Sequence, residues 1–333
     1  MSRFTRIAPR LSAILLGLSV AAAVGAAPAK LGVYQGAGCT GVQRMPQFAN
    51  WLGRAPDVVL EFISWEVLAK GGTWAVNCWK KAGYESVVFS MPMLPGGKRA
   101  TLADGAAGRF DDLFRRYGAE LVQHGYADSV IRIGWEFNFN WYPWAASRDP
   151  QSWVAYWRRI VSVLRSVPGQ NFKFDWCPAA GGSFKVESVY PGDDVVDIVG
   201  MDFYNVPVDR QALTPEQRWE SRMNMKYGLQ WHRDFAAQHG KRLSYPEWGT
   251  GKRKDGTGGG DDPYFIERMA QWIAGNDVAY HDYWDYTAKD FNAKLSDNHQ
   301  PNAAAAFRRN FSGAGERRSR PQPPVLEPRG RAN

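Results

Sequence analysis

Residues 130–164 read VIRIGWEFNFNWYPWAASRDPQSWVAYWRRIVSVL, and this stretch contains both elements from which the fold is built. Its first eight residues are mostly apolar or aromatic, which is typical of a parallel strand buried on both faces. Asp149 and Pro150 then supply a helix N-cap and a proline at the first helical position. Four apolar residues follow at helical spacing: Trp153, Trp157, Ile160 and Leu164. The stretch therefore predicts a strand followed by a helix.

The same unit recurs along most of the chain. Eight short apolar or aromatic runs predict strands at residues 31–36, 58–65, 86–91, 130–137, 172–177, 195–204, 243–248 and 279–286. Helical patterns lie between them. Thr214 is expected to cap one helix that runs as far as Gly240, because Gln217 stands three residues after Thr214 as in a capping box.

Eight such units predict an α/β fold, a single-domain (β/α)8 TIM barrel. A doubly wound open sheet shows the same alternation of strands and helices. That fold commonly carries a G-x-G-x-x-G or P-loop motif after a strand, and neither occurs here.

The two ends of the chain differ in composition from its body. In residues 1–27, three arginines precede an apolar run and a small-residue end, as in a secretory signal peptide; an uncleaved anchor is the alternative. Residues 314–333 are rich in Pro and Arg, which predicts a disordered tail. We therefore expect a signal peptide over 1–27, the barrel domain over 28–313 and a tail over 314–333, in a secreted or periplasmic protein.

The net charge of +8 comes mainly from these ends, which carry +3 each, so the body between them carries only +2. A nearly neutral body lacks the basic stripe of a nucleic-acid-binding protein. We expect a monomer with no nucleic-acid partner and, after signal cleavage, no membrane partner. Export permits a disulfide. Cys39 and Cys78 are the candidates, and their pairing is left open, whereas Cys177 lies in a predicted buried strand and is expected to be a free thiol.

Two glutamates stand at the ends of predicted strands among aromatic residues. Glu136 follows Trp135 at the end of the fourth strand, and Glu247 precedes Trp248 at the end of the seventh. The carboxyl ends of barrel strands carry the active site, and a charge among aromatic residues is costly unless it has a partner or a task. Capping of two strands at the surface is the alternative. Cleavage of a glycosidic bond requires two such carboxyl groups, one protonated and one ionised.

The neighbours of the glutamates suggest how the two could differ. Arg132 is four residues before Glu136, so strand alternation places both on one side, where the guanidinium would keep a carboxylate ionised. A buried ion pair between strands is the alternative role for Arg132. Asp202 and Tyr204 share a face of the neighbouring sixth strand, and the Tyr204 hydroxyl is expected to donate to Glu247.

Tryptophan is abundant at or just beyond the predicted strand ends, and indole faces suit the C–H surfaces of sugar rings. Trp141, Trp144 and Trp284 are the candidates for a cleft, whereas Trp176 and Trp248 fit either a cleft or the core. His281 is expected in the core. No metal-ligand or serine-hydrolase motif occurs, so the prediction includes no metal and no cofactor.

Three motifs in this order resemble glycoside hydrolase family 26: RIGWEFNFNWYPW at 132–144, YPGDDVVDIVGMDFYN at 190–205 and YPEWG at 245–249. The resemblance implies that Glu136 is the acid/base and Glu247 the nucleophile. It also places Trp141 and Trp284 around the bond that is cleaved, and it assigns nucleophile positioning and sugar contact to Asp202 and Tyr204.

The chain departs from the usual motif close to the acid/base. Trp135 replaces the family's usual His, and Asn138 is followed by Phe139 where Gly is usual. We therefore count Arg132, Trp135 and Asn138 among the substrate-binding candidates, with Trp141, Asp202, Tyr204 and Trp284. The resemblance implies a retaining hydrolase of a β-linked polysaccharide, foremost an endo-β-1,4-mannanase. Another β-glycan, the producer's own exopolysaccharide, or a non-catalytic carbohydrate-binding barrel are the alternatives.

Overall fold

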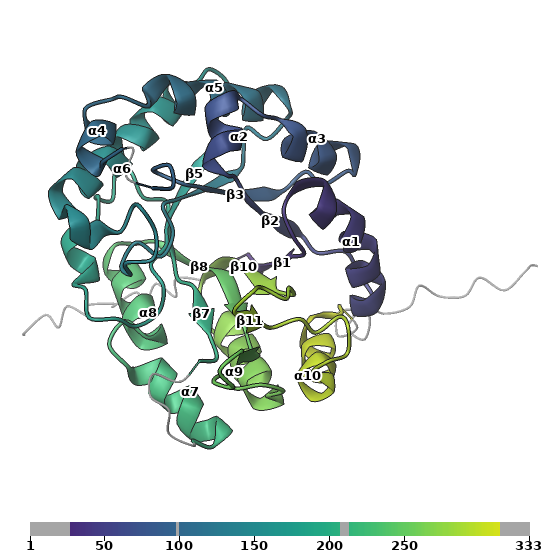
Figure 1. Ribbon diagram of the computed structural model, residues 1–333. Coiled ribbons are helices and arrows are strands. Elements are labelled where there is room, and N and C mark those ends of the chain that lie inside the picture. The colour runs from purple at the N-terminus through teal and green to yellow at the C-terminus, as the bar shows by residue number, and fades with distance from the viewer. Residues whose placement is uncertain (1–26, 98–99, 207–212, 314–333) are drawn as a thin grey trace, which may run out of the picture.

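The computed structural model describes residues 27–97, 100–206 and 213–313, and these form the predicted (β/α)8 barrel (Figure 1). Eight parallel strands pair in a closed ring: β1 (Lys30–Tyr34), β2 (Val58–Phe62), β3 (Val87–Met91), β4 (Val130–Ile133), β5 (Lys173–Trp176), β6 (Ile198–Gly200), β8 (Arg242–Gly249) and β10 (Val278–Trp284). Pairing of β10 with both β8 and β1 closes the ring. The fold prediction is confirmed.

The helices surround this ring. They are α1 (Gly38–Leu52), α2 (Trp65–Lys70), α3 (Trp74–Lys81), α4 (Leu102–Ala106), α5 (Asp111–Gln123), α6 (Pro150–Arg165), α7 (Pro215–Asn224), α8 (Leu229–Gln238), α9 (Pro263–Ala274) and α10 (Pro301–Phe311). Two of the predicted N-caps are present. Asp149 accepts from the Ser152 amide, and the Thr214 and Gln217 side chains form a capping box.

Two predicted elements are wrong, because the backbone turns at points where the apolar periodicity predicts one continuous element. The helix expected from Thr214 to Gly240 is divided into α7 and α8. Met225 is extended, Tyr227 has φ 57°, and Gly228 starts the second helix. The long sixth strand is also divided, into β6 and β7 (Phe203–Tyr204), which pairs with β8.

The link between β5 and β6 contains no α-helix, contrary to the expectation of a helix after every strand. It holds one short 3-10 helix, Val186–Val189; a second, Ala146–Arg148, precedes α6. Gly181 and Gly182 both have φ near +88°, a left-handed conformation that ends regular structure, and Pro191 and Gly192 follow. Arg158 of α6 donates to the Pro191 carbonyl and to Asp194, so the end of this link packs against α6.

The inside and the outside of the strand ring differ in chemistry. Apolar side chains fill the layer between strands and helices, as Phe174 and Trp176 on β5 do. The ring itself encloses polar groups. Asp175 accepts from the Ser244 hydroxyl and the Tyr280 hydroxyl, each at 2.5 Å, and both oxygens of Asp282 are buried without a hydrogen-bond partner among the described residues. These polar groups lie in the same interior as Arg132, and burial raises the pKa of both aspartates.

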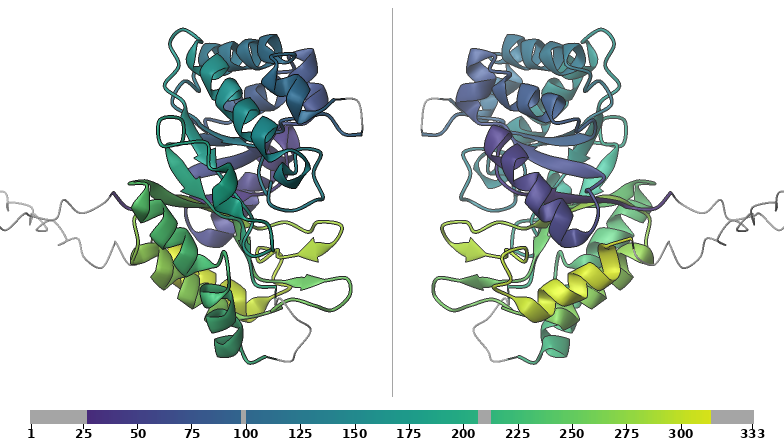
Figure 2. Two further views of the ribbon diagram at one scale, coloured as in Figure 1. Left: turned by 90° about the vertical axis from the view of Figure 1, so that its left-hand side faces the viewer. Right: turned by 90° about the vertical axis from the view of Figure 1, so that its right-hand side faces the viewer.

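A two-stranded antiparallel sheet, β9 (Lys252–Arg253) with β11 (Phe291–Asn292), projects beyond the carboxyl ends of the barrel strands (Figure 2). Its two segments come from the loops after β8 and after β10. This sheet forms a wall above one side of the ring.

Cys39 and Cys78 form a disulfide, which answers the question that the sequence leaves open, and Cys177 is a buried free thiol as expected. The proposed signal peptide, apart from Ala27, and the proposed tail lie outside the described residues. Within the described part of the chain, no helix has the length and apolar character needed to cross a membrane.

Candidate active site

A cleft of about 460 Å³ opens at the carboxyl ends of the strands, where a barrel carries its active site. Both glutamates line it. The other lining residues are largely aromatic, with two charged side chains from the wall: Phe62, Trp141, Tyr142, Tyr204, Val206, Arg253, Trp284, Ala288, Asp290 and Phe291. Of the nine site residues predicted from the sequence, five face this cleft: Glu136, Trp141, Tyr204, Glu247 and Trp284.

Glu136 is placed by a sharp turn just beyond β4. The strand ends at Ile133, and both Gly134 (φ 57°) and Glu136 (φ 52°) are left-handed. A left-handed glutamate is strained, and the Glu136 amide is held by the Cys177 carbonyl at 2.9 Å. The Trp141 indole donates to Glu136 Oε2 at 3.0 Å. The turn therefore presents the Glu136 carboxyl group to the cleft.

Glu247 is placed by an irregularity in β8. The Ser244 side chain points into the ring and the Tyr245 hydroxyl points out toward α9, but Glu247 again faces inward, three residues after Ser244. Strict alternation does not allow this. The register with β10 shifts between the pairs His281–Tyr245 and Tyr283–Trp248, so β8 carries one extra residue there. Pro246 lies in this interval and has no amide to donate.

Arg132 lies beneath the cleft and is fully buried, and the carboxylate of the cleft that it contacts is Glu247. Its Nη2 donates to Glu247 Oε1 at 2.8 Å and to Asp202, and its Nη1 contacts the Ser90 hydroxyl at 3.2 Å. The prediction relied on strand alternation as far as Glu136, whereas the turn at Gly134 interrupts it. The alternative role, a buried ion pair between strands, is the one that the structure shows.

Tyr204 donates its hydroxyl to Glu247 Oε2 at 2.8 Å, as expected from the sequence. Each Glu247 oxygen therefore accepts one hydrogen bond, from Arg132 or from Tyr204. Burial, with the charge of Glu247, raises the pKa of Tyr204 above its ordinary range, so the hydroxyl keeps its proton. These two hydrogen bonds hold the Glu247 carboxyl group in one orientation.

Glu136 has the opposite electrostatic surroundings. Burial, together with the charge of Glu247, raises the pKa of Glu136 to about 8, although Arg132 and the Trp141 indole act in the other direction. Burial is the larger cause, because a carboxyl group removed from water disfavours its charged form. Glu136 is therefore the protonated partner at neutral pH.

Two tryptophans form the aromatic surfaces of the cleft. Trp141 is 57% exposed and stacks on Phe139, with ring centroids 4.2 Å apart. Trp284, the last residue of β10, stacks on Tyr34 at 4.3 Å. Phe139, which replaces the family's usual glycine, thus supports the indole that contacts Glu136.

Four predicted substrate-binding residues do not line the cleft: Arg132, Trp135, Asn138 and Asp202. Trp135 is buried against Phe62 and Arg132. Asn138 is buried and bonded to the backbone of Ala179 and Gly181. These residues support the cleft from behind.

Four more of the singled-out residues lie in the core. Trp144, expected in the cleft, is buried and donates to the Trp135 carbonyl at 2.9 Å. Trp176 and Trp248 are fully buried. His281 is in the core as expected, accepting from the Trp248 indole at 3.2 Å.

The sequence gives no clear indication of the wall residues. Arg253, Asp290 and Phe291 follow β8 and β10 in loops without apolar periodicity, and β9 and β11 are only two residues long. The one available signal is position, because loops after barrel strands lie at the catalytic face. The ring centroids of Phe291 and Tyr204 are 5.2 Å apart, so the wall contacts the hydrogen-bond partner of Glu247 directly.

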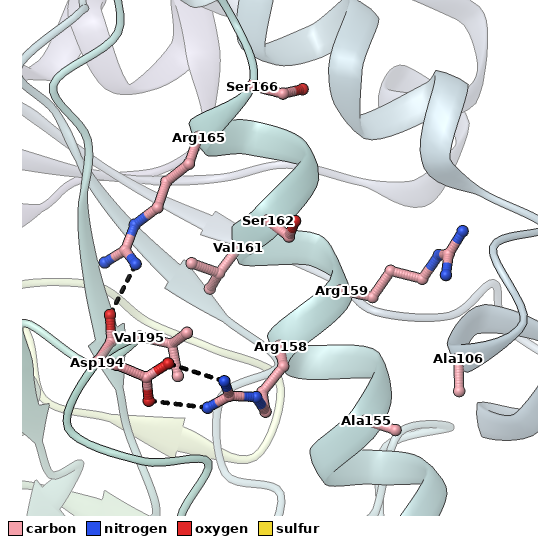
Figure 3. A pocket seen from close by; sticks show the side chains of 10 residues that line it. All are labelled: Ala106, Ala155, Arg158, Arg159, Val161, Ser162, Arg165, Ser166, Asp194 and Val195. Atoms are coloured by element: carbon pink, nitrogen blue, oxygen red, sulfur yellow. Dashed lines mark hydrogen bonds and ion pairs between the residues drawn. The ribbon is translucent and has the colours of Figure 1, made fainter.

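A second hollow, of about 660 Å³, lies on the outside of the barrel along α6 (Figure 3). Its arginines are already paired. Arg158 forms two hydrogen bonds with Asp194, and Arg165 donates to the Asp194 carbonyl. The hollow therefore offers a bound ligand little unsatisfied charge. Over the described ranges, no three His, Cys, Asp or Glu side chains are grouped to hold a metal ion.

Comparisons with known proteins agree with this geometry. The model of glycosyl hydrolase family 26 matches residues 122–214, which include Glu136, Arg132 and Tyr204 but not Glu247. A mannan endo-1,4-beta-mannosidase of Bifidobacterium adolescentis is 28% identical over 58% of this chain, and endoglucanase H of Acetivibrio thermocellus is 25% identical over 57%. The predicted resemblance to glycosyl hydrolase family 26 is confirmed.

The matched segment covers only 19% and 20% of those two relatives, so the chain spans about a fifth of their length. Solved structures show a likeness in fold over most of the chain. A GH26 β-mannanase of Bacteroides ovatus superposes with a TM-score of 0.59 at 15% identity, covering 84% of this chain and 89% of its own. The YdhT protein of Bacillus subtilis gives 0.62 at 15% identity, covering 86% and 87%. At such identities these structures support the fold.

Proposed function

We propose that this family 26 chain is a secreted, retaining glycoside hydrolase of a β-linked polysaccharide. The observation that carries the proposal is the pair of carboxyl groups in one cleft, with a raised pKa on Glu136 and two hydrogen-bond donors on Glu247. Secretion rests on the composition of residues 1–27.

The proposed reaction has two steps. In the first, a Glu247 oxygen bonds to the anomeric carbon, the glycosidic C–O bond breaks, and Glu136 gives its proton to the leaving oxygen. In the second, Glu136 takes a proton from water, the water oxygen bonds to the anomeric carbon, and Glu247 leaves. The net change is hydrolysis with retained configuration, and it uses only this chain's own groups.

β-1,4-Mannan and glucomannan are the first substrates to test, because one relative is named a mannosidase and another an endoglucanase. The aromatic cleft suits pyranose rings of either kind. The producer's own exopolysaccharide uses the same mechanism and belongs in the same panel, with xylans and β-glucans.

The test compares the wild type with Glu247→Ala and Glu136→Gln. On the best substrate of the panel, we expect Glu247→Ala to lose reducing-sugar release by at least about a thousandfold while polysaccharide affinity changes little. Glu136→Gln should retain its first step on aryl glycosides with acidic phenols, which need no proton on leaving. A wild type that binds glycans but hydrolyses none would instead make the chain a carbohydrate-binding barrel.

A further inference from the structure

Two large apolar side chains are strongly exposed in the described part of the chain, Trp141 at 57% and Trp74 at 48%. Trp141 belongs to the cleft. Trp74 starts α3 and does not line the cleft, so the mechanism gives it no task. Exposing this much apolar indole surface to water is unfavourable, so an exposed tryptophan is a candidate for a binding role.

The Trp74 ring packs against Gly38, at a position where a larger residue would not fit. A Cβ atom on Gly38 would lie 2.0 Å from Cζ3 and 2.2 Å from Cη2 of the Trp74 ring. Gly38 also has φ +55°, a conformation that other residues rarely adopt. The six-membered ring therefore lies directly against the backbone at the start of α1, which leaves the rest of the indole open to solvent.

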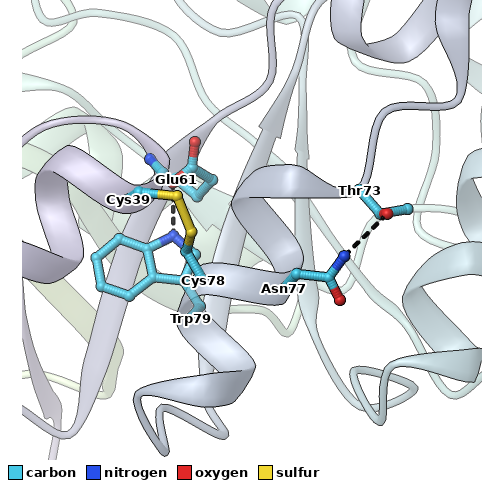
Figure 4. The surroundings of a disulfide bond; sticks show 7 residues. Cys39, Glu61, Thr73, Asn77, Cys78 and Trp79 are labelled. Carbon is cyan, nitrogen blue, oxygen red and sulfur yellow. Dashed lines mark hydrogen bonds between the residues drawn. A yellow bond between two sulfur atoms is a disulfide. The ribbon is translucent and has the colours of Figure 1, made fainter.

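The elements that carry Gly38 and Trp74 are linked to each other, and Figure 4 shows the disulfide, Glu61 and Trp79, which form the links. The Cys39–Cys78 disulfide joins the first turn of α1 to α3, with the two Cα atoms 5.2 Å apart. Buried Glu61, on β2, accepts from the Gly38 amide at 2.7 Å and from the Trp79 indole at 2.6 Å. The covalent bond and the two hydrogen bonds hold the helices that carry Gly38 and Trp74 against each other.

Trp74 lies close to the cleft on the same face of the barrel. The Tyr34 ring stacks on Trp284 of the cleft. Gly38 comes four residues after Tyr34, so the Cα atoms of Tyr34 and Gly38 are at most about 14 Å apart. Three of the intervening or adjoining residues, Gly36, Ala37 and Gly38, have the smallest side chains. Gln35, the one longer side chain between Tyr34 and Gly38, is buried and donates to Asp285.

We propose that Trp74 is a remote sugar-binding platform, on which a pyranose ring of the polysaccharide stacks beyond the catalytic cleft. The inference rests on the proposed function for the identity of the ligand. Indole faces attract the C–H surface of a sugar, and a preformed platform binds without the entropy cost of ordering a loop. Such a platform favours long chains over short ones, because a short ligand in the cleft does not reach it.

The binding test separates this platform from catalysis. The method is native electrophoresis in gels that contain soluble glucomannan, or whichever polysaccharide of the panel retards the chain most. The parent is the inactive Glu247→Ala chain. It is compared with three double variants that add Trp74→Ala, Trp74→Phe or Trp51→Ala to it. Trp51 is a matched control near the far end of α1, about 20 Å from Gly38. We expect Trp74→Ala to weaken affinity by about two- to tenfold, Trp74→Phe to restore part of it and Trp51→Ala to change nothing.

The kinetic test uses the chain with Glu247 intact. Trp74→Ala should raise KM for the polysaccharide by a similar factor and leave kcat and the KM for its trisaccharide unchanged. If the polysaccharide gel retards the Trp74→Ala variant and its parent equally, the platform proposal is wrong, even if the wild type hydrolyses the polysaccharide. A parent chain that no polysaccharide retards, or an equal loss on polymer and trisaccharide, overturns it too. Retardation that depends on Trp74 in a chain without turnover supports the platform while the hydrolase proposal fails.

Discussion

Glu136 is the residue whose protonation should control the rate. Burial and the charge of Glu247 raise its pKa to about 8, and Asp290, on the cleft wall, adds a weaker contribution of the same sign. The acid form must be present to protonate the leaving oxygen. We therefore expect kcat/KM to fall as the pH rises through about 8.

Asp290 provides a test of the direction in which nearby charge shifts the pKa of Glu136. Asp290→Asn removes a negative charge near Glu136, which lowers the pKa of Glu136, so the alkaline limb of the kcat/KM profile should move to lower pH. Asp128→Asn, which carries the same change beside the opposite end of β4, is the control and should leave the limb in place. A limb that moves to higher pH, or equally in both variants, contradicts this assignment.

Arg132 is expected to affect stability and catalysis together. Arg132→Ala leaves Asp202 and Glu247 buried without their cation, and the loss of one partner from a buried ion pair costs about 3–5 kcal/mol. Urea titration should show this as a lower free energy of unfolding, and activity should fall because Glu247 loses one of its two donors. Arg132→Lys keeps the charge and should recover most of the stability but less of the activity. Unchanged stability in Arg132→Ala would mean that the pair contributes nothing.

The sequence is informative about this site where it shows an unusual local environment. A carboxylate among aromatic residues at a strand end is visible without a structure, and both glutamates meet in the cleft. Strand alternation from Arg132 to Glu136 does not hold, because the left-handed turn at Gly134 and Glu136 interrupts the strand, and the carboxylate that Arg132 contacts in the cleft is Glu247. The inward direction of Glu247 depends on the extra residue in β8, which alternation also does not reveal.

Among the elements, α1 and α3 depend on a covalent link. The disulfide closes a loop with a sequence separation of 39 residues, for which the chain-entropy model gives about 4 kcal/mol of stabilisation at 25 °C. Reduction, or Cys39→Ser with Cys78→Ser, should lower the free energy of unfolding by up to that amount. Reductant added to the double variant is the control and should have no further effect. Equal stability of the oxidised and reduced wild type contradicts the estimate.

Element boundaries show why periodicity alone is insufficient. The pattern from Thr214 onward has correct start signals, and α7 begins where they place it. It ends early because Tyr227 adopts a left-handed conformation that no composition rule requires. The loop before β6 is the opposite case. Its glycines and prolines indicate a loop in the sequence, but the expected repeat of strand and helix predicts a helix there.

At the scale of the whole molecule, the barrel depends on the seam between β1 and β10. Gly32 on β1 faces Asp282 on β10, and a Cβ on Gly32 would lie 1.7 Å from the Asp282 carboxyl group and 2.8 Å from Val58. Gly32→Ala should therefore destabilise the barrel by about 1–3 kcal/mol or prevent its closure. Gly96→Ala has open space at the Cβ and is the control. Thermal unfolding followed by circular dichroism compares them, and equal melting temperatures contradict the crowding at the seam.

The architecture is predictable from the sequence because eight buried strands alternating with helices leave few other solutions. The wall of the cleft is not, because β9 and β11 come from two loops 38 residues apart and are too short to carry a pattern. Their pairing depends on the barrel bringing the two loops together.

This wall has a practical consequence. β9 and β11 pair with each other and with no barrel strand, yet they deliver Arg253, Asp290 and Phe291 to the cleft. The barrel that holds the two glutamates and the loops that line this side of the cleft are therefore separate parts. Transplanting both loop segments together from a relative should change which polysaccharide is preferred, while the recipient barrel keeps its cooperative melting and its pair of carboxyl groups.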